Sequence, residues 1–71
     1  MYIVMEIQTN ANGTIGTLTN TYEDKLQAES KYHTVLASAA VSALPVHACV
    51  VMTEKGEMQL NKAYEHNAQG E

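Results

Sequence analysis

The most constraining feature of this 71-residue chain is a run of 22 residues, from Tyr32 to Thr53, that contains no Asp, Glu, Lys or Arg. A chain of this length buries roughly 60% of the surface that its unfolded form exposes, so it is only marginally stable alone. One such domain has too small an interior to enclose so long an uncharged segment. The run therefore predicts that other copies of the chain cover part of it.

Composition narrows the possible partners. The net charge is −4, with four lysines and no arginine. Nucleic-acid polymers are bound by dense cationic surfaces, so this composition excludes them. Small phosphorylated ligands remain open, because backbone N–H groups, hydroxyls and lysines can hold them.

The same sequence predicts a cytoplasmic protein with no membrane partner. The single cysteine, Cys49, leaves no internal disulfide, which fits a reducing compartment. The segment Met1–Met5 lacks the basic region of a secretory signal. The uncharged run is interrupted by polar residues and Pro45, and it holds no stretch of about 18 apolar residues.

Alternation of apolar and polar residues with period two predicts four strands. The alternating segments are 1–9, 14–19, 46–53 and 58–65. Asn12-Gly13 predicts a type I′ hairpin turn between the first two strands, and Gly56 a turn between the last two.

A helical period predicts one helix over 22–43, between the two hairpins. Asn20 or Thr21 would cap its start, and Pro45 would end it. The expected fold is α+β with ββαββ order, one helix on a four-stranded antiparallel sheet of strand order 2-1-3-4. Residues 1–65 would form the domain and residues 66–71 a flexible tail.

Two surfaces are predicted to meet partners. One is the far side of the helix, which carries small uncharged residues instead of Lys and Glu, namely Ser30, Thr34, Ala37, Ser38 and Val41. The other is the sheet face expected to lie away from the helix, formed by Tyr2, Val4, Gln8, His47, Cys49 and Val51. An obligate homo-oligomer is expected, with a dimer as the default. The alternative is an Ala/Ser-rich helix surface that simply tolerates water.

Aromatic, histidine and lysine side chains are candidates for a ligand pocket between subunits. The candidates are Lys31, Tyr32, His33, His47, Lys62, Tyr64 and His66. Rings could stack on a nucleobase and the two lysines could meet phosphate. No catalytic residue, metal or cofactor is predicted, because no zinc-type spacing or nucleophile motif is present. A His47–Cys49 dyad and a three-histidine metal site are weaker alternatives to simple core packing.

Several short segments resemble a family of short, uncharacterised phage and prophage proteins of gut Firmicutes. The segments are Ala28-Glu29-Ser30-Lys31-Tyr32-His33, Ala39-Ala40-Val41-Ser42, Pro45-Val46-His47 and Tyr64-Glu65-His66. The resemblance brings no catalytic motif. It implies a phage accessory protein, by analogy with compact oligomers that bind nucleotide immune signals.

The expected function is therefore sequestration of a nucleotide-derived immune signal, such as a cyclic ADP-ribose variant or a cyclic oligonucleotide, without turnover. A protein-binding inhibitor of a host defence protein is the first alternative, since an acidic chain could cover a cationic site. A hydrolase using His33, His47 or His66 as general base is the second. An accessory subunit with only structural contacts is the third.

Overall fold

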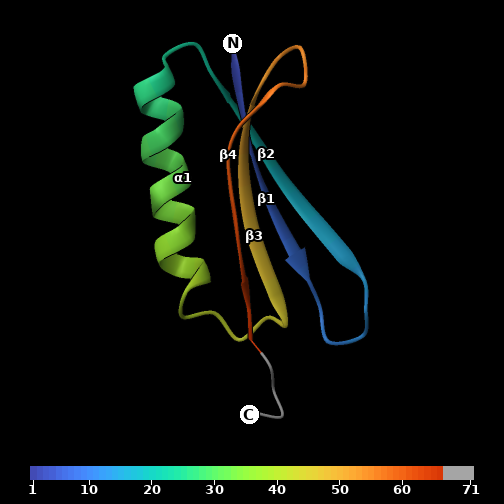
Figure 1. The fold of residues 1–71 in the computed structure, drawn as a ribbon. Helices are drawn as coiled ribbons and strands as arrows, with labels where there is room; N and C mark the ends of the chain where they lie inside the picture. The colour runs from blue at the N-terminus through green and yellow to red at the C-terminus, as the bar shows by residue number, and fades with distance from the viewer. Residues whose placement is uncertain (67–71) are drawn as a thin grey trace.

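The computed structural model describes residues 1–66, which form four strands and one helix. Their order is β1 (Tyr2–Thr9), β2 (Ile15–Tyr22), α1 (Lys25–Ala39), β3 (Val46–Thr53) and β4 (Met58–Glu65). The strands make one antiparallel sheet of order β2-β1-β3-β4, and α1 runs along one side of it (Figure 1). The predicted α+β class and strand order are confirmed. Of the predicted 66–71 tail, all but His66 lies outside the described residues.

Both hairpins turn on a glycine with positive φ, but the first turn differs from the prediction. A type I′ turn needs positive φ at two residues, and only Gly13, at 89°, has it, so Asn12 does not. The Asn10 amide donates to the Thr14 carbonyl (2.8 Å), and the Gly13 amide donates to Asn10 (2.9 Å). The second hairpin repeats this pair of hydrogen bonds around Gly56. Each hairpin is thus closed by a short turn that ends on glycine.

The helix α1 is shorter than predicted at both ends. Strand β2 continues to Tyr22, which pairs with Tyr2, so the cap falls on Asp24, whose carboxylate accepts from the Leu26 amide at 2.9 Å. The helix ends at Ala39. Its 15 residues span about 22 Å, close to the roughly 26 Å length of an eight-residue strand. The helix therefore returns the chain along the length of the sheet to the end at which β3 begins.

The helix covers the sheet face that was predicted to lie away from it. Side chains of α1 form one core cluster with residues of β1 and β3; its members are Val4, Ala28, Tyr32, Val35, Cys49 and Val51. The predicted assignment of Val4, Cys49 and Val51 to the far face is wrong. A period of two shows which residues share a face, but both faces of these strands are apolar. Composition therefore does not predict which face of the sheet the helix packs against.

The opposite face carries the other set of alternating residues. Ile3, Met5 and Ile7 of β1 lie opposite Met52, Val50 and Ala48 of β3, and all six side chains are partly exposed. No element of residues 1–66 lies over this face (Figure 1). The described part of the chain contains no helix long and apolar enough to cross a lipid bilayer.

Candidate functional site

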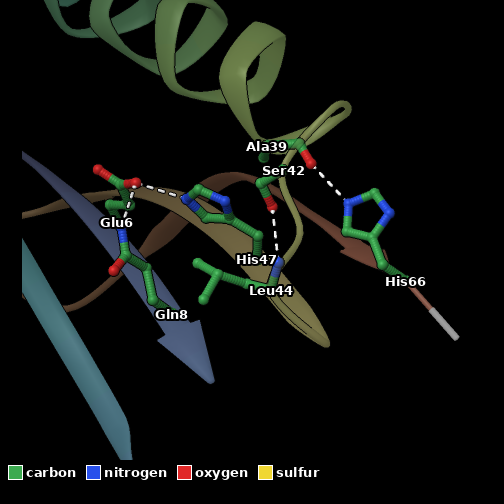
Figure 2. Close-up of polar contacts among 7 residues, drawn as sticks. All are labelled: Glu6, Gln8, Ala39, Ser42, Leu44, His47 and His66. Atoms are coloured by element: carbon green, nitrogen blue, oxygen red, sulfur yellow. Dashed lines mark hydrogen bonds and ion pairs between the residues drawn. The ribbon is translucent and has the colours of Figure 1, made fainter. Parts of the chain in front are cut away.

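The most deeply buried polar group lies under the C-terminal end of the helix. His47, at the start of β3, is 4% exposed and lies directly across from Gln8 of β1. Because side chains alternate between the two faces of a strand, Glu6, two residues before Gln8 in β1, lies on the same face as Gln8 and His47. Figure 2 shows the His47 ring pointing at the Glu6 carboxylate, with Gln8 beside it. The register of the two central strands therefore builds a three-residue polar cluster at the edge of the core.

The Glu6 carboxylate is the centre of this cluster. Its Oε2 atom lies 2.5 Å from His47 Nε2 and accepts a hydrogen bond from Gln8 Nε2 at 2.9 Å. Burial by itself would raise the pKa of Glu6, but the bonds from Gln8 and His47 outweigh it and hold the pKa below its ordinary value of 4.5. The carboxylate thus stays ionised and accepts both hydrogen bonds.

The other ring nitrogen of His47 is unusual. Nδ1 is buried and has no hydrogen-bond partner among residues 1–66. A buried polar atom without a hydrogen-bond partner lowers stability, so the Glu6 contact is the interaction that holds this ring in place.

His66, the residue that follows β4, forms a hydrogen bond with the end of the helix. Its Nε2 lies 2.7 Å from the carbonyl oxygen of Ala39, the last helical residue (Figure 2). Its backbone amide donates to the Pro45 carbonyl at 2.8 Å. A side chain that donates to a terminal carbonyl stabilises the end of a helix. His66 therefore joins the end of the described chain to the helix terminus.

Cys49 lies in the core and is a poor nucleophile there. Its side chain is fully buried. Burial raises the pKa of the thiol to about 11, and the nearby Glu6 carboxylate adds to the rise. At neutral pH the group is a neutral thiol, which argues against a His47–Cys49 dyad.

We expect native Cys49 to react slowly with iodoacetamide. At pH 8 a thiol of pKa 11 is about 0.1% ionised, against about 10% for one of pKa 9, so alkylation is slowed about 100-fold by ionisation alone. Mass spectrometry of the alkylated chain with and without urea measures this ratio. Equal rates in the two conditions would show that Cys49 is not buried as described.

The structure divides the predicted ligand residues among four places. Tyr32 is 6% exposed and belongs to the core, and His33 lies beside it with ring centroids 5.4 Å apart. Lys62 and Tyr64 of β4 gather with His66, the residue that follows the strand. The Lys62 ammonium lies 5.2 Å from the Tyr64 ring centre, and His66 stacks on that ring at 6.4 Å. The remaining two, Lys31 and the buried His47, lie in neither group.

A shallow cleft, largely open to solvent, lies where the first half of the helix passes the end of β2. It has a volume of about 430 Å³ and is lined by Tyr22, Gln27, Ser30, Lys31 and Thr34. Lys31 is the one predicted ligand residue that lines it, and Ser30 and Thr34 come from the predicted interface. The cleft combines an aromatic ring, an amide, two hydroxyls and one ammonium group.

The predicted subunit interface on the helix is exposed. Its members, Ser30, Thr34, Ala37, Ser38 and Val41, all face solvent, and Val41 lies beyond the helix end at 84% exposed. The Thr34 hydroxyl donates to the Ser30 carbonyl at 3.0 Å, which satisfies this polar group within the helix. Contact between copies through this surface remains a prediction.

Sequence reasoning missed Glu6 and Gln8 as hydrogen-bonding partners in the cluster around His47. A carboxylate in the middle of an apolar strand was the available signal, because such a group needs a partner when buried. Within residues 1–66, no group of three or more His, Cys, Asp or Glu side chains is arranged to hold a metal ion.

Comparison of the chain with protein-family models, curated proteins and solved structures finds no match. The geometry of these clusters is therefore the basis for a functional interpretation.

Proposed function

We propose that the protein is a non-catalytic binding protein that holds a small anionic, ring-bearing ligand in the cleft between α1 and the end of β2. The ligand class is a nucleotide-derived signal, bound without turnover. The observation that carries the proposal is the cleft itself, whose volume of about 430 Å³ falls in the usual range for small-molecule sites.

The cleft residues match the parts of such a ligand. The Tyr22 ring offers a face for a nucleobase, and Gln27 offers a donor and an acceptor for its edge. Lys31 supplies the ammonium group for a phosphate, with the Ser30 hydroxyl beside it. Lys31 is also partly buried, so its charge is less screened than that of a freely exposed lysine.

Binding without turnover is supported by what the candidate catalytic groups do in the fold. Cys49 is a buried neutral thiol, and His47 is held by Glu6. His66 is bonded to the end of the helix. These three groups are committed to packing and hydrogen bonds, whereas His33 is exposed and is not among the residues that line the cleft. The cleft is therefore left to act through recognition.

The resemblance to phage proteins selects the ligands to test, namely cyclic ADP-ribose variants and cyclic oligonucleotides. We expect one of them to be depleted from solution by the purified protein and to be recovered intact after heat denaturation. Chromatography of the filtrate before and after heating measures both steps. Recovery of a cleaved product would instead indicate a hydrolase, and no depletion by any member of the panel would contradict the proposal.

We expect Lys31→Gln to weaken binding of the depleted ligand about tenfold, because one charge-assisted hydrogen bond in an open site contributes roughly 1.4 kcal/mol. Two variants make the same charge change elsewhere. Lys25→Gln lies on the helix outside the cleft and is the control. Lys62→Gln tests the Tyr64–His66 cluster. Loss of binding in Lys62→Gln alone would move the site to β4.

A further inference from the structure

The open sheet face is the largest feature of the fold without a role. It is formed at its centre by Ile3, Met5, Ile7, Ala48, Val50 and Met52, on the side of β1 and β3 away from the helix. We propose that two copies of this chain pack face to face through the open sheet face. The result is a symmetric dimer with a four-layer order of helix, sheet, sheet and helix.

The charge distribution favours a second copy as the occupant. On β1, β2 and β3 the open sheet face carries no Asp, Glu, Lys or Arg, and Thr17, Thr19 and Thr21 of β2 line one side of its centre with hydroxyls. Its one charged residue, Glu65, lies at the end of the edge strand. The chain carries a net charge of −4, so two copies repel each other elsewhere. This face is where like-charge repulsion is smallest.

The size of the face is also sufficient. Four strands about 4.8 Å apart and eight residues long at about 3.3 Å per residue outline roughly 500 Å² per copy. Two such faces bury about 1,000 Å² when each is counted as a flat area, without the extra surface of protruding side chains. This area reaches the threshold for a specific interface. An isologous contact uses the same patch on both copies, so one flat face supplies both halves.

The side chains suit this packing. Two sheets pack with inner faces about 10 Å apart, and Ile, Val and Met alternate here at the spacing that such packing needs. Met5 and Met52 are flexible and fill irregular gaps. The cleft at Tyr22 and Lys31 lies on the helix side, so the dimer leaves both clefts open.

Light scattering after size exclusion tests the proposal. The wild-type chain is expected to elute at twice its 7.8 kDa mass. Met5→Lys places two ammonium groups in the centre of the interface and is expected to return the mass to that of one chain. Ala37→Glu is the matched control on the exposed helix surface, and it is expected to leave the doubled mass unchanged.

A second measurement uses the wild-type protein alone and covers the case in which Met5→Lys does not fold. Limited oxidation by hydrogen peroxide, read by mass spectrometry, compares Met5 and Met52 with Met1, which is 49% exposed at the end of the chain. We expect oxidation of Met5 and Met52 to slow several-fold as the protein is concentrated, while Met1 does not change.

Several results would overturn the proposal. A wild-type protein with the mass of one chain at every concentration would do so. A monomer whose open sheet face binds a different protein would overturn it in the same way. A dimer that Ala37→Glu disrupts and Met5→Lys does not would place the contact on the helix. Equal oxidation of Met1 and Met5 in a concentrated dimer would show that the open sheet face is not the interface.

Discussion

Tyr32→Ala is expected to remove a large part of the free energy that stabilises the fold. Tyr32 is the one aromatic residue in the buried cluster, where it packs with Val4 and Val51. Removing a large aromatic side chain from a core costs about 3–5 kcal/mol, partly through the cavity that it leaves. The total stability of a chain of this size is roughly 4–10 kcal/mol. Circular dichroism during urea denaturation measures the loss.

Tyr32→Phe is the control for this prediction. It keeps the ring and removes only the hydroxyl, so we expect the urea midpoint to remain close to that of the wild type. The two variants also decide between two roles for Tyr32, which was predicted as a pocket residue and is 6% exposed in the fold. A Tyr32→Ala variant that keeps the wild-type urea midpoint but loses ligand binding would restore Tyr32 to the pocket and contradict its place in the core.

The strands were the most predictable part of this fold. The bounds of β3 and β4 match the predicted segments 46–53 and 58–65, because alternation is a local property of consecutive residues. Glycine also marked both turns, although the type of the first was wrong. The start of the helix was less predictable. Pairing with β1 extends β2 to Tyr22, and no pattern in the neighbouring residues predicts this pairing.

The face covered by the helix could not be read from the sequence. Val4 and Val51 on one face and Ile3 and Val50 on the other are equally suitable for burial. Tertiary packing makes the choice. The same ambiguity underlies the dimer proposed above, because the helix of residues 1–66 covers one apolar face of the sheet and leaves the other open.

The clusters around His47 and Tyr22 depend on contacts between distant parts of the chain. Glu6 and His47 are 41 residues apart and meet only because β1 and β3 are central neighbours in a particular register. The cleft likewise needs Tyr22 at the end of a strand beside Lys31 on a helix. The sequence showed which residue types were available, whereas the register decided which of them meet.

Glu6→Ala is expected to lower the free energy of unfolding by about 1–3 kcal/mol, the cost of leaving a buried donor unsatisfied. His47 already has one ring nitrogen without a partner among the described residues, and this variant removes the partner of the other. Glu6→Gln keeps an acceptor for His47, so we expect a loss of about 1 kcal/mol or less. Glu57→Ala, in the exposed turn, is the matched control. Urea denaturation at pH 7 measures all three.

Acidification provides an independent test of the same contact. Because the pKa of Glu6 is lower in the folded state, its ionised form stabilises the fold fully above the unfolded value near 4.5. That contribution disappears as the pH falls through the lower pKa of the folded state. We therefore expect the stability difference between wild type and Glu6→Gln to shrink as the pH falls below about 5. A difference that grows on acidification would show that the folded state favours the protonated carboxyl group, which is the opposite of what the bonds from Gln8 and His47 require.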